Sequence, residues 1–284
     1  NLTLVLKFSG EVHKYFIFNL FFIACIFATF IFLSEASGPT TSAPNLVKGI
    51  NYEGLRKLGD PANFAIDYFN QGVDELIFID IVASLYGRNS LLEVIEKTSK
   101  GVFAPITVGG GIRTLEDVKK ILRSGADKVA MNTSAILDPS IINKASDLYG
   151  SQCVVLSIQA KQVNEAKWEA YYDSGREKSG RDILDWAKEI EQRGAGEILI
   201  NSVDRDGTSL GPDFALIEAI NSWVNIPVIA SGGITTSKQI KRLHDLGIEA
   251  VALGTALHYR KTTCTDLKNE LRKMGVPLRR FENE

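Results

Sequence analysis

Two segments of this chain, 122 residues apart, are copies of each other. Residues 105–133 align without a gap on residues 227–255, and the pair Gly110–Gly111 recurs as Gly232–Gly233. Each copy reads as a strand, a glycine-rich turn, a helix and a second strand. A βαβ unit that recurs half a domain later is typical of a closed parallel barrel with two similar halves. We therefore predict an α/β fold, a (β/α)8 barrel with a two-fold internal repeat, whose glycine-rich turns lie at the carboxyl ends of the strands.

Length and composition fit one large soluble domain. The chain has 284 residues, of which 45% are hydrophobic, and a net charge of −2. A charge this close to zero argues against a general nucleic-acid surface. The three cysteines, Cys25, Cys153 and Cys264, are far apart and lack the spacing of metal ligands. We therefore expect no metal, no cofactor and no nucleic-acid partner.

The hydrophobic pattern predicts seven strands with helices between them. The strands are expected at residues 76–81, 104–108, 127–132, 153–158, 197–203, 226–230 and 249–254. The helices are expected at residues 89–100, 138–149, 181–193, 213–223, 236–246 and 264–274. A further helix begins at Thr114, where Asp117 completes a capping box, and ends at Gly125. Residues 161–175 alternate and turn, which indicates a small hairpin above the barrel.

An eighth strand has to precede residue 76, where the sequence is unusual. Residues 15–34 carry no charge, and residues 38–45 form a small-residue linker. We divide the chain into a leader with linker, 1–45, and a barrel domain, 46–284. The leader reads as a membrane anchor or signal segment, or as a mis-started reading frame with no targeting information. The 122-residue spacing places the first strand at Leu33–Ser37, so either the leader imitates that strand or the strand is missing from this chain. The expected location is accordingly the cytoplasm, or a membrane reached through residues 15–34.

Several segments together resemble one known family. They are residues 48–61 (KGINYEGLRKLGDP), 73–81, 108–112, 125–133, 149–161, 194–208 and 229–234. In this order, over about residues 46–260, they resemble the cyclase subunit of imidazole glycerol phosphate synthase, a lyase of histidine biosynthesis with a TIM-barrel fold. The resemblance implies a glutaminase partner that supplies ammonia. It also implies a bis-phosphorylated substrate on which an imidazole ring is closed.

The glycine-rich turns fit a ligand that carries two phosphates. Backbone N–H groups can converge on a phosphate where glycine leaves room, and barrels commonly bind phosphate after strands 7 and 8. The repeat predicts two phosphate sites on opposite sides of the mouth. Their candidate residues are Gly110, Gly111, Asn132 and Thr133 on one side and Gly207, Ser231, Gly232, Gly233, Gly254 and Thr255 on the other. The alternative is that these glycines only make tight turns.

The chain departs from the family at the catalytic centre. The resemblance implies two aspartates that act as general acid and base, at the ends of strands 1 and 5. The strand-5 position is Gln159, whose amide can hydrogen-bond but cannot exchange a proton near neutral pH. For strand 1, an ungapped count back from Lys48 reaches Thr40, and the repeat offers Ser37 with Glu35 nearby. Asp206, after strand 6, matches a family active-site residue. Activity of this chain is therefore doubtful by sequence.

Charged residues at the starts of three strands match a gate for ammonia in the family. Glu75, Lys128 and Glu197 are expected at the bottom of the barrel, and Glu75 and Glu197 are themselves 122 residues apart. Asp127 matches a residue that faces the glutaminase. The alternative is an ion-pair ring that only closes the barrel bottom, since this face normally serves stability.

Four functions stay open at this point. The first is the cyclase subunit itself. The second is a diverged paralogue that passes ammonia to a separate amidotransferase for surface sugars, which the segment IDIVASLYGRN favours. The third is the sister isomerase of the same pathway, suggested by residues 209–213. The fourth is a non-enzymatic barrel tethered to a membrane, which rests on the leader alone.

Overall fold

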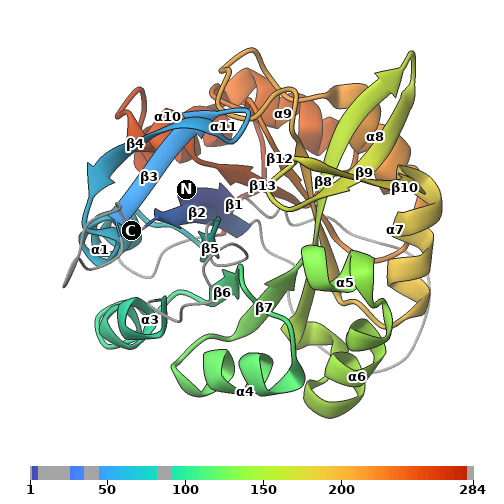
Figure 1. Cartoon of the computed structure of the whole chain (residues 1–284). Helices are drawn as coiled ribbons and strands as arrows, with labels where there is room; N and C mark the ends of the chain where they lie inside the picture. The colour runs from blue at the N-terminus through green and yellow to red at the C-terminus, as the bar shows by residue number, and fades with distance from the viewer. Residues whose placement is uncertain (1, 6–25, 35–44, 82–90, 280–284) are drawn as a thin grey trace, which may run out of the picture.

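A closed barrel of parallel strands, ringed by helices, forms the body of the protein (Figure 1). The structure is a computed structural model and describes residues 2–5, 26–34, 45–81 and 91–279. Within these ranges the barrel strands follow one another around the ring, each parallel to the next. They are β2 (Ile26–Ser34), β5 (Glu75–Asp80), β6 (Ile106–Gly109), β7 (Lys128–Met131), β8 (Val154–Asn164), β11 (Glu197–Ser202), β12 (Val228–Ser231) and β13 (Ala250–Leu253). The predicted barrel and its seven strands after residue 75 are confirmed.

The strand β2 closes the barrel. Its residues Ala28–Leu33 pair in parallel with Glu75–Asp80, and Thr29 pairs with Leu253 on the other side. The second half of the uncharged segment therefore supplies the first strand. The residue equivalent to Val155 of the fifth strand is Ala28, whereas the 122-residue spacing predicts Leu33. Residues 15–25 and 35–44, which include the candidates Glu35, Ser37 and Thr40, lie outside the described residues. Among the residues that are described, no helix has the length and apolar character to cross a membrane. The division of the chain at residue 45 stays a prediction.

Helices cover the outside of the barrel between consecutive strands. They are α1 (Pro61–Asn70), α3 (Leu91–Ser99), α4 (Leu115–Arg123), α5 (Thr133–Leu137), α6 (Ser140–Tyr149), α7 (Ile183–Gln192), α8 (Phe214–Trp223), α9 (Ser237–Asp245), α10 (Thr255–His258) and α11 (Cys264–Lys273), with a 3-10 turn η1 (Ser151–Cys153). The capping box predicted at Thr114 is confirmed, because its side chain accepts from the Asp117 N–H and Asp117 bonds back. Asp60 and Asp182 cap α1 and α7 more simply, by accepting backbone N–H bonds with their carboxylates.

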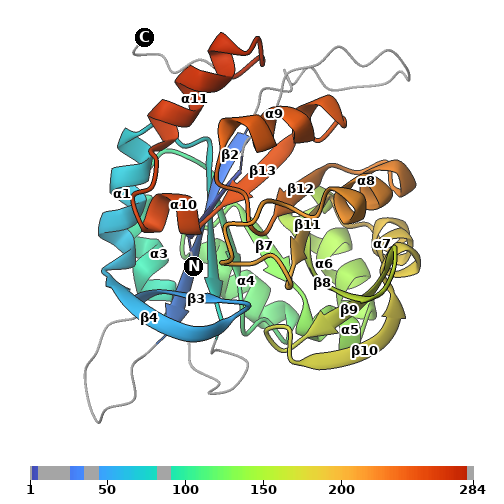
Figure 2. The ribbon, with the colours of Figure 1, turned by 90° about the horizontal axis from the view of Figure 1, so that it is seen from above.

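Two antiparallel hairpins lie at one end of the barrel (Figure 2). The end of β8 and β9 (Lys167–Tyr172) form the hairpin predicted for residues 161–175, and β10 (Glu177–Asp182) adds a further hairpin with β9 that was not predicted. The hairpin of β3 (Asn45–Ile50) and β4 (Glu53–Gly59) was not predicted. Its turn has Asn51 at φ 51° and Tyr52 at φ 65°. Tight turns with positive φ favour glycine. Because this turn has a tyrosine at such a position, the sequence gives no signal for it. A short strand β1 (Leu2–Val5) pairs antiparallel with β2, β5 and β13.

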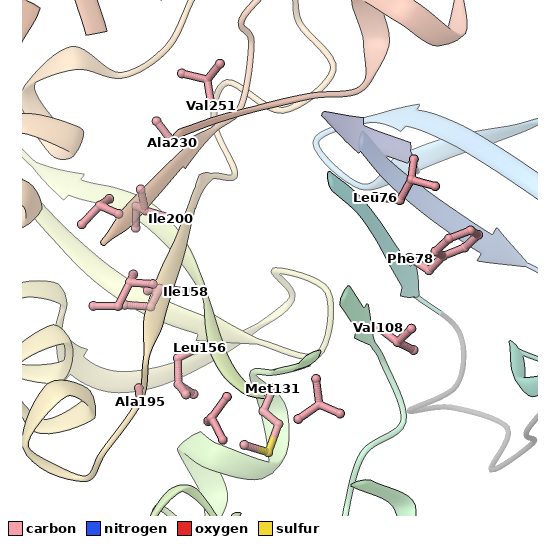
Figure 3. Close-up of a cluster of buried hydrophobic side chains, with 14 of the residues drawn as sticks. Leu76, Phe78, Val108, Met131, Leu156, Ile158, Ala195, Ile200, Ala230 and Val251 are labelled. Atoms are coloured by element: carbon pink, nitrogen blue, oxygen red, sulfur yellow. The ribbon is translucent and has the colours of Figure 1, made fainter. Parts of the chain in front are cut away.

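Alternation along the strands creates two hydrophobic layers. Leu76 and Phe78 of β5 point outward and pack with residues such as Val108, Met131 and Leu156 against the helices (Figure 3). The other set faces the inside of the barrel, where Ile77, Ala130, Val155, Leu199, Ile229, Ala250 and Ala252 form a second cluster. Side chains on the same strand two residues apart share a face. The inward row of β5 therefore begins with Glu75, and that of β8 ends near Gln159.

Closure by β2 predicts that the middle of this strand is sensitive to proline. Ile31 pairs with Phe78 in the parallel ladder. Proline at Ile31 removes a backbone donor from the sheet, so Ile31→Pro should lower the free energy of unfolding by about 1–3 kcal/mol. The matched control Ile31→Val keeps the backbone donor and should change it by less than about 1.5 kcal/mol. Urea unfolding measures both. Equal stability of the proline and valine variants would show that β2 is not part of the barrel.

Candidate active site at the barrel mouth

The repeated glycine pairs make the turns that follow β6 and β12. Gly110 and Gly232 have φ of 95° and 103°, a region that favours glycine. A Cβ at Gly110 would collide with the Asp80 carbonyl oxygen, and one at Gly232 would lie 2.9 Å from the Ser202 carbonyl oxygen. Asp80 and Ser202 are again 122 residues apart. The turns therefore need these glycines with or without a ligand, and phosphate binding at them stays a prediction.

The first predicted phosphate site lies in a cavity of about 490 Å³, a size typical of ligand pockets. Gly110, Gly111, Asn132 and Thr133 all line it, as does Gln159. Two buried side-chain atoms here, Asn132 Oδ1 and Ser134 Oγ, have no hydrogen-bond partner. A polar ligand in the cavity can complete the hydrogen bonding of both. The sequence interpretation missed Ser134, although it directly follows the predicted Asn132–Thr133 pair.

The second predicted site is brought together only in part. Gly207 and Thr255 line a cavity of about 840 Å³ beside the β3–β4 hairpin, together with Arg56 and Lys261. Gly233 instead packs under the loop after β11, where the Gly211 N–H donates to its carbonyl oxygen over 3.0 Å. The remaining candidates, Ser231, Gly232 and Gly254, are near these residues in sequence but line neither of the two cavities. The two cavities occupy different sides of the mouth.

The register of the barrel identifies the partner of Gln159 on the first strand. On β8, Val155 pairs with Glu197 and Gln159 with Asn201. On β2, Ala28 pairs with Glu75, the repeat partner of Glu197, and Phe32 pairs with Ile79. Phe32 thus occupies on the first strand the register that Gln159 occupies on the fifth. Neither residue can exchange a proton near neutral pH. Loss of the acid and base stays a prediction, because the other strand-1 candidates lie outside the described residues.

A buried ion pair stands at the mouth instead. Lys48 Nζ lies 3.0 and 3.1 Å from the two carboxylate oxygens of Asp206, and the side chains are only 2% and 9% exposed. Burial lowers the pKa of Lys48, and the Asp206 carboxylate offsets this only in part. Asp206 was predicted as a site residue, whereas Lys48 was not. The available signal was a lysine inside an otherwise apolar strand, Asn45–Ile50.

A buried tyrosine joins the two hairpins to this centre. Tyr52 accepts a short hydrogen bond from the Asn201 amide, and its ring lies 3.5 Å from where a Cβ of Gly175 would stand. Burial and then the Asp206 carboxylate raise the pKa of Tyr52 well above the ordinary value. Its hydroxyl therefore stays protonated and can only hydrogen-bond. Asn201 pairs with Gln159 between β11 and β8. Tyr52 therefore fixes the strand that neighbours Gln159 at the mouth.

At the opposite end of the barrel, three inward side chains form a closed ion cluster. Lys128 Nζ lies 3.1 Å from the nearer Glu75 oxygen and 2.9 Å from the nearer Glu197 oxygen. The Thr107 hydroxyl also donates to Glu75 over 2.6 Å. Burial acts to lower the pKa of Lys128, but the two carboxylates outweigh it and raise that pKa. The three residues predicted as a gate therefore meet in space. Their role as a gate stays a prediction.

The neighbouring Asp127 is exposed, and its carboxylate also supports the fold. Its carboxylate accepts from the Ile106 N–H over 2.8 Å and so fixes the start of β6. No group of three or more His, Cys, Asp or Glu side chains within the described ranges is arranged to hold a metal ion.

Removing the Asp206 charge should make stability depend on pH in a defined direction. In Asp206→Asn, Lys48 is buried without its counter-charge, so the free energy of unfolding at neutral pH should fall by about 3 kcal/mol. The folded-state pKa of Lys48 then drops further below that of the unfolded chain, which binds more protons. Stability should therefore recover as pH rises, by at most about 1.4 kcal/mol per pH unit.

Urea unfolding at neutral and alkaline pH measures this recovery. The matched control is Asp245→Asn, which breaks the half-exposed pair with Lys241. It should cost at most about 0.5 kcal/mol, without recovery at high pH. A pH-independent loss in Asp206→Asn would mean that Lys48 is not the group that responds.

Comparison with known proteins identifies a family for this barrel. The model of the histidine biosynthesis protein family matches residues 42–263. Three curated relatives share the name imidazole glycerol phosphate synthase subunit HisF. The protein from Legionella pneumophila is 53% identical over 191 residues, which are 67% of this chain and 90% of that protein. The protein from Trichormus variabilis is 45% identical over 243 residues, 84% of this chain and 95% of that protein. The protein from Endomicrobium trichonymphae is 44% identical over 239 residues, 84% of this chain and 92% of that protein.

These names favour the cyclase-subunit hypothesis over the isomerase, the surface-sugar paralogue and the tethered binding barrel. The matched region includes the paired glycines, the Lys48–Asp206 ion pair and the Glu75–Lys128–Glu197 cluster. The chain therefore belongs to the histidine biosynthesis protein family and, within it, to the imidazole glycerol phosphate synthase HisF subunits.

Proposed function

We propose that this chain is a synthase barrel subunit that binds a bis-phosphorylated substrate at its mouth and receives ammonia from its bottom face, with weak ring closure. The observation that carries the proposal is the ion cluster at the bottom of the same barrel whose mouth holds the two cavities. A phosphorylated metabolite does not cross membranes unaided, so we expect the chain in the cytoplasm with its substrate.

A substrate with a phosphate at each end fits the two-sided mouth. One end would enter the first cavity near Asn132 and Thr133, and the other would enter the second cavity near Gly207 and Thr255. Lys48 lines the second cavity and is paired with Asp206. The reacting centre of the substrate would then lie between the cavities, above Gln159. Gln159 can orient the substrate by hydrogen bonding but cannot carry a proton for it.

Ammonia would enter past the ion cluster. Glu75, Lys128 and Glu197 occupy the inward positions at the strand starts, below the inner hydrophobic cluster. The two carboxylates hold Lys128 as a cation across the passage, so the ion pairs themselves keep it closed. Opening would need Lys128 to leave at least one of its carboxylates.

A glutaminase would dock where the bottom face is apolar. Phe103, which precedes β6, is 84% exposed, and Trp223, at the end of α8, is 50% exposed. Leu148, near the end of α6, is also largely exposed. Exposed aromatic side chains of this kind are enriched at protein interfaces. Asp127 is exposed on the same face and directly precedes Lys128 of the ion cluster.

Substitutions on the bottom face test the docking. Phe103→Asp should weaken binding of a glutaminase subunit to the full chain by on the order of tenfold or more, because it puts a charge into an apolar contact. The control Leu210→Asp changes a leucine that is 73% exposed in the loop after β11, at the other end of the barrel. Leu210→Asp should leave the dissociation constant unchanged. Calorimetry measures both. Equal weakening by the two variants would argue against docking at the bottom face.

Turnover with ammonium salts tests the chemistry without a glutaminase. Loss of a general acid or base costs roughly 10²–10⁴-fold each, so this chain should close the ring at least about 10²-fold more slowly than the Trichormus variabilis subunit. Gln159→Asp should raise the rate, because it restores one proton-exchanging group. Gln159→Asn has the size of aspartate without the acid and should not. Wild-type turnover equal to that of the relative would overturn the proposed weakness of ring closure.

A further inference from the structure

The tip of the β9–β10 hairpin, residues 171–175, is bonded to the predicted first phosphate site. The Asn132 amide donates to the Tyr171 carbonyl oxygen over 3.2 Å. The Asp173 N–H donates to the Thr133 hydroxyl oxygen, also over 3.2 Å. Two side chains that the sequence assigned to a phosphate thus hold the hairpin tip.

Two more bonds hold the tip from other strands. The Ser174 hydroxyl donates to the Ile81 carbonyl oxygen, just after β5, over 3.1 Å. The Gly175 N–H donates to Gln159 Oε1 over 2.7 Å, which is the shortest of the four bonds. Each of the four joins one side chain to one backbone group. Rotation of these side chains therefore frees residues 173–175 from the four bonds, while Tyr171 stays paired with β8 and β10.

The tip backbone is held in a conformation that side chains disfavour. Asp173, Ser174 and Gly175 have φ of 50°, 59° and 76°. Only the last of these is a glycine, so the first two residues store strain in the left-handed region. The turn between β9 and β10 and the four bonds to the mouth hold this conformation together. Their loss favours a different arrangement of the tip.

The charge of the closed cavity opposes a phosphate. Its charged lining residues are Asp80, Asp138, Asp173 and Arg113, so carboxylates outnumber cations. A phosphate bonded to Thr133 would lie close to Asp173, whose own N–H already bonds the Thr133 hydroxyl. Like charges a few ångströms apart repel strongly where water is partly excluded. The tip and a phosphate therefore disfavour each other at this site.

We infer that the hairpin tip is a displaceable plug, in which Asp173 takes the place of the substrate's phosphate until a phosphorylated ligand drives the tip out. Gln159 is then a positioning residue that tethers the plug through Gly175. This inference rests on the proposed function, because it presumes that the first cavity takes a phosphate. The inference gives Gln159 a positive role, which is to hold the tip by accepting the Gly175 N–H bond.

Binding of inorganic phosphate to the full chain tests the charge of the plug. Asp173→Asn keeps the backbone bond to Thr133 and removes the carboxylate, so it should bind phosphate on the order of tenfold more tightly than the wild type. The control Glu177→Gln removes an exposed carboxylate from the same hairpin, outside the cavity lining. It should bind phosphate like the wild type. Titration followed at the Thr133 amide by NMR measures the three affinities.

Hydrogen exchange of the tip amides tests the tether. Gln159→Asn is one methylene too short to reach Gly175, so exchange at Gly175 should speed up about three- to tenfold. Gln159→Glu keeps an acceptor oxygen at the same reach and should retain protection. Added phosphate should speed up exchange at Asp173 and Gly175 in the wild type, because it displaces the tip.

The outcomes separate this inference from the proposed function. Slower tip exchange with phosphate, or equal phosphate affinity of Asp173→Asn and wild type, would make the tip a fixed wall and overturn the plug while the phosphate site stands. Absence of phosphate binding in every variant would overturn the plug and also the substrate site of the proposed function. Tighter binding in Asp173→Asn with faster tip exchange supports both.

Discussion

Closure of the barrel by β2 is the constraint on which the rest of the structure depends. It fixes the register of the first strand against Glu75 on one side and Leu253 on the other. The strands then alternate together, so one inward row begins with charges at the bottom and ends with polar groups at the mouth. The same register pairs Phe32 with Ile79, at the level where Gln159 of β8 pairs with Asn201. A slip of β2 by one residue would turn every one of its side chains to the other face.

The internal repeat allowed most of the fold to be predicted, because glycine turns and helix caps are local signals. The βαβ units, the Thr114 capping box and the meeting of Glu75, Lys128 and Glu197 all follow from spacing and strand direction. The position of β2 was predicted wrongly. Ala28 pairs with Glu75, whereas the spacing of the repeat predicts Leu33 at this place in the barrel. Apolar residues that look alike give little information on register within a strand.

The parts of the site that the sequence did not predict depend on contacts between distant segments. Lys48 and Asp206 are 158 residues apart and meet only because the β3–β4 hairpin folds over the mouth. That hairpin was not predicted because Tyr52 occupies a turn position with positive φ, where glycine is favoured. The bond between Gln159 and Gly175 likewise depends on how the β9–β10 hairpin bends back. No local pattern marks the glutamine as a tether rather than as a lost catalytic residue.

The cavities, the buried ion pair and the bottom ion cluster are all present, whereas Gln159 and Phe32, which share one register on β8 and β2, cannot exchange a proton. We propose that the mouth binds a bis-phosphorylated ligand whether or not the ring is closed. Calorimetric titration of the full chain with the bis-phosphorylated ribotide, in the absence of ammonia, tests it most directly. We expect saturable one-to-one binding in the micromolar range, weakened by added inorganic phosphate. Absence of saturable binding, or binding that inorganic phosphate does not weaken, would contradict it.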